Sequence, residues 1–194
     1  MRGSPQKLLV FLLTHPFCKN SRQIDGVISA VSYNLIIKKL IHQFKYKPNL
    51  SKLSEVIGEL MADFLSQNEA FINFLDKYNP VFIPIPLSAK RFRERGYNHA
   101  ELISYYVAQY FNRPMDTKML VRVKDTKPQY KLKKEDRRKN IEGAFKIGEN
   151  QIVPGSIILI DDIATTYATL KEAARVLKKA GAKRVLGVTF ARDI

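Results

Sequence analysis

The chain has 194 residues, of which 45% are hydrophobic and 26% charged, a balance that excludes long disordered stretches and fits one domain with a single substantial core. Its 33 basic and 18 acidic residues give a formal net charge of +15. Such an excess predicts attraction to polyanions, either nucleic acid or phosphorylated metabolites. Salt screens this attraction, so the charge alone supports only non-specific binding.

The chain contains one cysteine, Cys18. A single cysteine excludes an internal disulfide framework and a cysteine-rich zinc site, and it indicates a cytoplasmic protein. His15 and His42 have a spacing that matches no zinc pattern, so we expect no zinc. Residues 8–13 form the candidate membrane segment, but six apolar residues are too few to cross a bilayer, and we expect no membrane span.

The first part of the chain is predicted to contain one strand and two helices. Residues 1–24 show no clear periodicity and are interpreted as an N-terminal appendage. A short strand is predicted over residues 27–33. Apolar residues recur at helical spacing over residues 36–44 and 53–64, which predicts two helices. We expect both helices to precede the first strand of the main sheet.

That first strand is predicted over residues 81–85 (VFIPI). Residues 88–96 (SAKRFRERG) carry four basic side chains and are predicted to form a basic loop. A helix is then expected to begin with Asn98 as its N-cap and Glu101 as the capping-box partner three positions on. Residues 120–123 are predicted to form another short strand.

The most informative segment is residues 157–170 (IILIDDIATTYATL), which follows a predicted strand over residues 145–147. Four successive apolar residues predict a strand buried on both faces, which emerges into solvent at Asp161 and Asp162. A helix and a second strand, residues 184–190, complete a strand–helix–strand unit. Such units pair their strands in parallel and bind ligands at the carboxyl ends of the strands. We therefore expect both carboxylates to face a ligand crevice.

The turn after the two aspartates, residues 165–169, is rich in threonine. Its backbone N–H groups and the hydroxyls of Thr165, Thr166 and Thr169 would lie at a helix N-terminus, which favours an anion. Two carboxylates beside it can accept hydrogen bonds from the 2- and 3-hydroxyls of a ribose whose 5-phosphate the turn holds. The alternative is that the aspartates merely cap the helix. No GxxxxGK[ST] loop occurs, which disfavours a P-loop nucleoside triphosphatase.

This segment resembles the phosphoribosyl pyrophosphate (PRPP) signature of type I phosphoribosyltransferases, which combines two apolar residues, Asp-Asp and a Thr/Gly-rich loop. These enzymes usually carry glycine where this chain has Tyr167. Glycine allows the backbone to approach a phosphate closely or to adopt a positive φ. A tyrosine there either crowds the 5-phosphate or points outward, and this choice leaves catalysis in question.

The chain as a whole, over residues 24–192, resembles the ComF family of bacterial phosphoribosyltransferase-like proteins associated with competence for DNA uptake. The resemblance implies an α/β fold over residues 25–194, with a parallel-sheet, type I phosphoribosyltransferase-like (Rossmann-like) core and an N-terminal helical or hood region. Residues 1–24 correspond to a truncated form of the cysteine-rich zinc-binding segment with which family members often begin. The motifs that carry the resemblance are residues 40–46 (LIHQFKY), 83–102 (IPIPLSAKRFRERGYNHAEL), 127–145 (KPQYKLKKEDRRKNIEGAF), 158–170 (ILIDDIATTYATL) and 181–192 (GAKRVLGVTFAR).

The resemblance also implies roles for individual residues. Asp161 and Asp162 would hold the ribose and, through the ligand, Mg²⁺, without a protein cage for the metal. Together with Arg137 and Arg138 they form the predicted catalytic set. The predicted PRPP-binding residues are these two aspartates, Ala164, Thr165, Thr166, Tyr167, Ala168 and Thr169 at the 5-phosphate, and Leu87, Ser88, Ala89 and Lys90 at the pyrophosphate.

Residues 131–139 (KLKKEDRRK) include six basic residues. Three interpretations stay open: a mobile hood over pyrophosphate, a basic stripe that binds single-stranded nucleic acid by phosphate contacts and stacking, and a solvated loop. The basic segment at residues 88–96 poses a similar choice. The predicted nucleic-acid-binding residues are Lys90, Arg91, Arg93, Arg95, Tyr130, Lys131, Lys133, Lys134, Arg137, Arg138 and Lys139.

Two functions follow as hypotheses. The first is a protein that binds PRPP or a ribose 5-phosphate group with Mg²⁺, binds single-stranded DNA, and acts in DNA uptake for natural transformation. A helicase or a recombination protein of the uptake machinery would be its protein partner. The alternative is an active Mg²⁺-dependent phosphoribosyltransferase of nucleotide or base metabolism, whose acceptor the sequence does not reveal.

Overall fold

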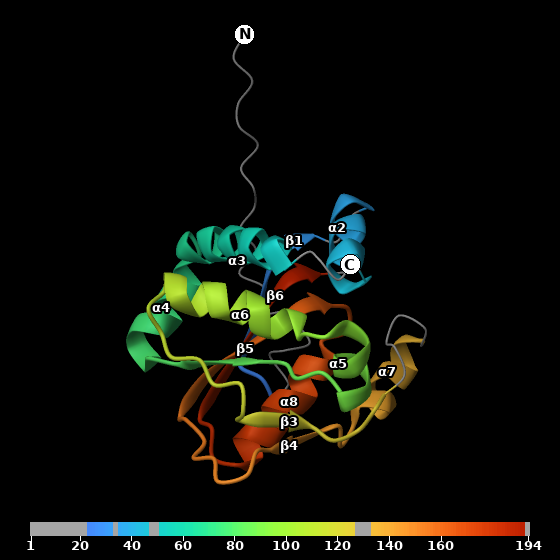
Figure 1. Cartoon of the computed structure of the whole chain (residues 1–194). Helices are drawn as coiled ribbons and strands as arrows, with labels where there is room; N and C mark the ends of the chain where they lie inside the picture. The colour runs from blue at the N-terminus through green and yellow to red at the C-terminus, as the bar shows by residue number, and fades with distance from the viewer. Residues whose placement is uncertain (1–22, 33–34, 47–50, 127–132, 193–194) are drawn as a thin grey trace.

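The computed structural model describes residues 23–32, 35–46, 51–126 and 133–192 (Figure 1). Within these ranges the main sheet has four parallel strands in the order β1-β6-β5-β2. A second, antiparallel sheet pairs β3 with β4. The strands are β1 (Gly26–Ser32), β2 (Val81–Pro84), β3 (Leu120–Arg122), β4 (Phe145–Ile147), β5 (Ser156–Ala164) and β6 (Arg184–Arg192).

Helices cover both faces of the main sheet (Figure 1). In the described part of the chain none of them is long and apolar enough to span a membrane. The helices are α2 (Leu35–Tyr46), α3 (Ser51–Ser66), α4 (Glu69–Tyr78), α5 (Ala89–Arg95), α6 (His99–Tyr110), α7 (Lys134–Ile141) and α8 (Ala168–Lys179).

The alternation of side chains along β5 divides the core into two layers. Ile157 and Leu159 belong to one buried cluster with Leu177 of α8 and residues of the β3–β4 sheet. Ile158 and Ile160 belong to a second cluster, which contains the buried faces of α3, α4 and α6. Successive residues of a strand point to opposite faces, so a strand that is apolar throughout needs cover on both sides. The structure confirms the predicted parallel-sheet α/β fold.

The predicted strand–helix–strand unit is also confirmed. It consists of β5, α8 and β6, and β5 pairs with β6 in parallel from Ser156↔Arg184 to Ala164↔Arg192. The buried face of α8 carries Leu170, Ala173, Ala174 and Leu177, as the apolar spacing predicted.

The N-terminal part of the fold differs from the prediction in two respects. The strand expected near residue 27 is β1, but it is itself an edge strand of the main sheet, paired with β6. The expectation that β2 is the first strand of that sheet was therefore wrong, because pairing between segments so distant in sequence leaves no local signal. The sequence reasoning also missed α4, although Asn68 caps it by accepting a hydrogen bond from the Phe71 amide at 3.0 Å.

The segment after β2 is helical and not a loop. Ser88 caps α5, since its Oγ accepts a hydrogen bond from the Arg91 amide at 3.4 Å, and Gly96 ends the helix at φ 80°. Asn98 precedes α6 as predicted, but the predicted capping box was wrong. The Asn98 side chain instead donates from Nδ2 to the Ile85 carbonyl at 3.1 Å, and so ties α6 to the end of β2.

The basic region before β4 is partly helical. The interpretation of residues 131–139 as a solvated loop does not hold for residues 134–139, which belong to α7. Residues 127–132, which include Tyr130 and Lys131, lie outside the described ranges. The division of the chain at residue 25 stays a prediction, because residues 1–22 lie outside them as well.

Candidate functional site

Asp161 and Asp162 lie at the carboxyl end of β5, but inside the strand. The prediction that the strand ends at them was wrong, since β5 continues to Ala164 alongside β6. Both residues are partly buried. The longer strand brings the aspartates close to the edge of the sheet at which parallel α/β folds bind ligands.

The residues on either side of Asp162 keep one register between β5 and β6, with Asp161 opposite Thr189 and Ile163 opposite Ala191. Both carboxylates bind the local backbone. Asp161 Oδ1 accepts a hydrogen bond from the Asp162 amide at 2.9 Å, and Asp162 Oδ1 accepts one from the Ile163 amide at 2.7 Å. These bonds orient both carboxylates at the end of the strand.

The turn between β5 and α8 carries polar groups without partners in the described chain. The amides of Thr165 and Thr166 donate to no other described residue. Thr166 Oγ1 is buried and has no hydrogen-bond partner among the described residues. Because these groups precede the N-terminus of α8, the turn has the donors and the helix dipole that favour an anion.

Tyr167 is the last residue before α8 and adopts a left-handed conformation, with φ 56° and ψ 13°. Its side chain is only 7% exposed and packs into the core, so the interpretation that it points outward was wrong. The Arg192 guanidinium lies 5.5 Å from the centre of the ring. A non-glycine residue in this region costs about 1 kcal/mol. The turn thus keeps the backbone conformation for which glycine is usually used, and the buried ring offsets the strain.

Arg192 was missed by the sequence reasoning. It is the last residue of β6, in register with Ala164 of β5 and Ser32 of β1. Its Nε is buried and has no hydrogen-bond partner within the described ranges. Only the strand register places this guanidinium beside the turn, so no local signal could have found it.

The predicted pyrophosphate turn lies at the start of α5. Leu87 and Ser88 precede the helix, and Ala89 and Lys90 begin it. Ser88 is buried, and its Oγ donates to Asp125 Oδ1 at 2.6 Å. This hydrogen bond lowers the pKa of Asp125 below its ordinary value. Ser88 therefore joins α5 to the segment that follows β3.

Arg122, at the end of β3, was also missed. Its Nη2 donates to Thr126 Oγ1, and its guanidinium lies 5.5 Å from the centre of the Phe145 ring. The pKa of Arg122 is lowered to about 10, chiefly by burial and also by the neighbouring Arg91, although Asp161 and Asp125 act in the opposite direction. The fold therefore brings Arg122 of β3, Arg91 of α5 and Asp161 of β5 into one electrostatic neighbourhood.

Three proteins with related sequences are a competence protein F, a competence protein ComFC and a DNA utilization protein YhgH. Competence protein F of Haemophilus influenzae is 31% identical over 148 residues, which are 75% of this chain and 63% of that protein. Competence protein ComFC of Bacillus subtilis is 36% identical over 166 residues, 85% of this chain and 63% of that protein. DNA utilization protein YhgH of Salmonella typhimurium is 24% identical over 161 residues, which are 82% of this chain and 68% of that protein. No family model matches the sequence.

Over most of its length the chain is similar in sequence to the competence proteins of the ComF type. It spans somewhat less than two thirds of the length of the two competence proteins, 63% in each case. The resemblance inferred from the sequence motifs is confirmed.

The basic residues predicted to bind DNA that the structure describes lie on or beside two helices, α5 and α7, which are both on the right of Figure 1. On α5, Lys90 and Arg93 are exposed, and Phe92 between them is 48% exposed. Arg91 and Arg95 are partly buried. On and beside α7, the exposed cations are Lys133, Arg138 and Lys139, whereas Arg137 is partly buried and Lys134 has no described side chain.

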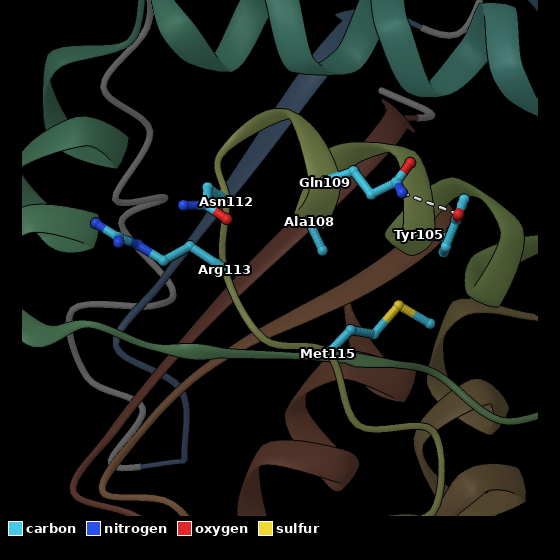
Figure 2. Close-up of a pocket in the computed structure, with 6 residues that line it drawn as sticks. All are labelled: Tyr105, Ala108, Gln109, Asn112, Arg113 and Met115. Carbon is cyan, nitrogen blue, oxygen red and sulfur yellow. Dashed lines mark hydrogen bonds between the residues drawn. The ribbon is translucent and has the colours of Figure 1, made fainter.

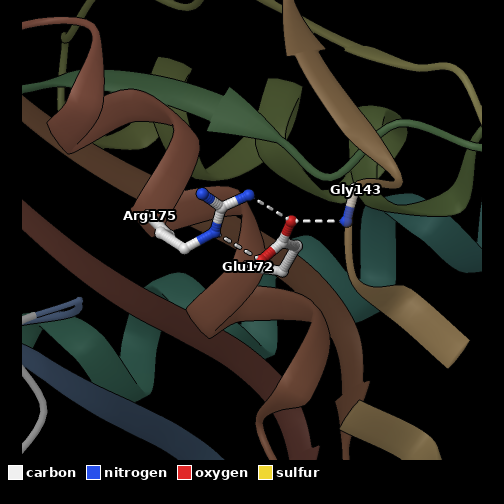
Figure 3. A network of polar contacts seen from close by, with 3 residues as sticks. All are labelled: Gly143, Glu172 and Arg175. Carbon is white, nitrogen blue, oxygen red and sulfur yellow. Dashed lines mark hydrogen bonds and ion pairs between the residues drawn. The ribbon is translucent and has the colours of Figure 1, made fainter. Parts of the chain in front are cut away.

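The segment at the carboxyl end of α7 is anchored to α8 through the buried side chain of Glu172 (Figure 3). Glu172 Oε1 accepts a hydrogen bond from the Gly143 amide at 2.8 Å. Arg175 donates to both oxygens of Glu172, from Nε at 2.8 Å and from Nη2 at 2.7 Å. Burial alone would raise the pKa of Glu172, but these hydrogen bonds hold it below its ordinary value. The hydrogen bond from Gly143 to Glu172 thus joins the helix that follows the Thr-rich turn to the end of the basic helix, and Arg175 of the same helix α8 holds the carboxylate in place.

A pocket of about 270 Å³ lies at the C-terminal end of α6 (Figure 2). None of the site residues predicted from the sequence lines it. Its walls are formed by Tyr105, Ala108, Gln109, Asn112, Arg113 and Met115.

Proposed function

We propose that this ComF-family chain binds a ribose 5-phosphate group, as in PRPP, together with Mg²⁺, binds single-stranded DNA, and acts in DNA uptake for natural transformation. The observation that supports the sugar site best is the position of Asp161 and Asp162 directly before a turn whose Thr165 and Thr166 amides donate to no other described residue. The names of the relatives support the role in competence.

The two parts of this site suit the two ends of a ribose 5-phosphate. The aspartates are acceptors, which match the 2- and 3-hydroxyls of the sugar. The turn at the N-terminus of α8 supplies donors and a favourable dipole for the 5-phosphate. Thr166 Oγ1, which is buried without a partner in the described chain, would complete this set of donors.

The residues present also fit Mg²⁺ if the ligand supplies part of its coordination shell. Within the described ranges, no cluster of three or more His, Cys, Asp or Glu side chains is placed to hold a metal ion. Mg²⁺ prefers oxygen donors and is often bound by one or two carboxylates plus substrate phosphates. Asp161 and Asp162 would therefore hold it jointly with the ligand, and when bound it would neutralise charge on the diphosphate.

The proposal for DNA rests on charge and on an exposed aromatic side chain. A net charge of +15 attracts a polyanion, and α5 carries the exposed cations Lys90 and Arg93 together with the exposed ring of Phe92. Phosphate contacts combined with stacking of bases on aromatic rings are the usual means of holding a single strand. A helicase or a recombination protein of the uptake machinery remains the proposed protein partner.

The sugar site is tested by calorimetry with PRPP and Mg²⁺ on the wild-type chain and on Asp161→Asn/Asp162→Asn. We expect the wild type to bind, and the double variant to lose at least about tenfold in affinity because charged hydrogen-bond acceptors are removed. The matched control is Asp63→Asn/Asp76→Asn, which removes two carboxylates far from the predicted site in sequence. Equal binding by the aspartate double variant and the wild type would place the ribose elsewhere.

A second candidate function is catalysis of phosphoribosyl transfer. It is favoured by the left-handed backbone of Tyr167, because the turn keeps the conformation expected of a phosphate loop. In this reaction an acceptor forms a bond to C1 of the ribose while the bond to pyrophosphate breaks, and the site must stabilise the departing charge. The roles of Arg137 and Arg138 in this step remain predictions. Release of pyrophosphate from PRPP by the wild type, and its loss in Asp161→Asn/Asp162→Asn, would establish the activity.

A further inference from the structure

Two arginine side chains from different elements converge on Thr126. Arg91 of α5 donates from Nη2 to the Thr126 backbone carbonyl at 2.9 Å. Arg122 of β3 donates from Nη2 to the hydroxyl oxygen of the same residue. Thr126 itself is 6% exposed. One buried residue therefore holds two guanidinium groups close together.

The charges around this pair do not balance. Arg91 and Lys90 both contribute electrostatically here, and together with Arg122 they make three cations. Two carboxylates act electrostatically on Arg122, those of Asp125 and Asp161. Arg91 and Arg122 are both partly buried, so water screens the repulsion between their two guanidinium groups less than it would at an exposed site. An anion placed between the arginines would relieve this repulsion.

We propose that Arg91 and Arg122 form a subsite for a phosphate or diphosphate anion beside Asp161. The inference rests on the proposed function in one respect, namely that Asp161 belongs to the site for the ribose. It adds two arginines that sequence reasoning did not assign to that site. Guanidinium groups bind phosphate oxygens with paired, charge-assisted hydrogen bonds, so two of them suit a phosphate or diphosphate.

The subsite is built before any ligand arrives. Arg122 lies over the Phe145 ring, and its Nε donates to the Lys124 carbonyl at 3.4 Å. Leu120 and Phe145 anchor the β3–β4 sheet in the core. Arg91 is held through Thr126 by the same segment. Fixed donors lose little conformational entropy on binding, and this favours affinity.

The test is calorimetry with inorganic pyrophosphate in the absence of Mg²⁺, on the wild type and on Arg91→Gln and Arg122→Gln. Each variant is expected to lose about tenfold or more in affinity. Lys146→Gln is the matched control, because it removes one positive charge from the same small sheet at an exposed position next to Phe145. It should bind within about twofold of the wild type.

Arg122→Lys is included in case Arg122→Gln fails to fold. It keeps the positive charge but lacks the planar guanidinium that forms paired hydrogen bonds with phosphate. It should bind pyrophosphate more weakly than the wild type and more tightly than Arg122→Gln. Thermal unfolding of every variant is recorded beside the titration. Wild-type affinity in folded Arg91→Gln and Arg122→Gln would overturn the inference.

Ribose 5-phosphate separates this inference from the proposed function. Its binding should depend on Asp161 and Asp162 and should change less than about threefold in the arginine variants. If ribose 5-phosphate does not bind at all while pyrophosphate binding still depends on both arginines, the proposed sugar site fails and the anion subsite stands.

A last comparison identifies the source of the anion. A short oligothymidine and PRPP are titrated into the wild type and Arg122→Gln. If only PRPP and pyrophosphate lose affinity, the subsite serves the diphosphate of the sugar ligand. If the oligothymidine loses as much, the subsite also receives a phosphate of the DNA backbone. Either result supports the subsite, and no loss for any of the three ligands contradicts it.

Discussion

The guanidinium of Arg192, at the end of β6, lies 5.5 Å from the centre of the Tyr167 ring, in the turn before α8. A cation over an aromatic ring is attracted to the ring face, by about 1 kcal/mol or more where water is excluded. The contact joins the end of one strand to the turn that follows the neighbouring strand. It explains why a tyrosine is stable at a position where the backbone φ is 56°.

The first prediction concerns the left-handed backbone at Tyr167. Both Tyr167→Ala and Tyr167→Gly lose the buried ring and should lower the free energy of unfolding by several kcal/mol. Tyr167→Gly should be the more stable of the two by about 1 kcal/mol, because glycine adopts a positive φ without strain. Urea denaturation measures the difference.

The control for this pair is an ordinary helical position. Glu59 is exposed within α3, and there the order should reverse, with Glu59→Ala more stable than Glu59→Gly by about 1 kcal/mol. The same order at both positions would contradict a left-handed residue 167.

The second prediction separates two helix caps that have the same residue type. Asn98 donates through Nδ2 to the Ile85 carbonyl, so Asn98→Asp removes a buried donor and should destabilise the fold by about 1–3 kcal/mol. Asn68 accepts through Oδ1 from the Phe71 amide, a role that aspartate fills equally well. Asn68→Asp should therefore change the stability by about 0.5 kcal/mol or less. Thermal unfolding of both variants is the measurement. If Asn98→Asp does not lower the stability, Asn98 acts as an N-cap acceptor, as the predicted capping box requires.

The third prediction is a pH dependence through Glu172. The pKa of this carboxyl is lowered in the fold. Its ion pair therefore stabilises the protein at pH values above 4.5, the ordinary pKa of glutamate. That stabilisation is lost as the pH falls through the lowered pKa. Glu172→Gln should therefore be less stable than the wild type at neutral pH, and the difference should shrink in acid.

Urea denaturation from neutral pH to about pH 3 tests this, because that window extends below the ordinary glutamate pKa. Glu149 is exposed, and Glu149→Gln provides the comparison. Its difference from the wild type should stay near zero throughout. A constant deficit of Glu172→Gln at every pH would mean that the side chain stabilises only by packing.

The fourth prediction concerns single-stranded DNA. Affinity should fall steeply between low and near-physiological ionic strength, because binding releases counterions. Arg93→Gln should reduce the steepness of the salt dependence. Phe92→Ala should lower affinity by about tenfold at every salt concentration, since stacking on an aromatic ring is not screened.

Tyr105 supplies the control for Phe92, because it is 50% exposed on a different helix, α6. Fluorescence anisotropy with a labelled oligonucleotide measures all of these variants. If Tyr105→Ala weakens binding as much as Phe92→Ala, the strand does not run over α5.

The sequence predicted the elements whose signals are local. The apolar run of β5, the periodicity of α8 and the acidic pair between them all lie within residues 157–179, and the strand–helix–strand unit follows from them. The same segment identified Asp161, Asp162 and the Thr-rich turn as the candidate site. Local reasoning failed for α5, where the basic side chains of a capped helix were interpreted as a loop.

Tertiary structure alone decided which distant residues join that segment. Arg192 reaches the turn because β6 pairs with β5 in one register, and a shift of one residue would turn its side chain to the other face. Arg122 and Arg91 meet at Thr126 because the β3–β4 sheet packs onto the core beside the start of α5. Such contacts depend on pairing and packing across long loops, and no pattern within a short stretch of sequence encodes them.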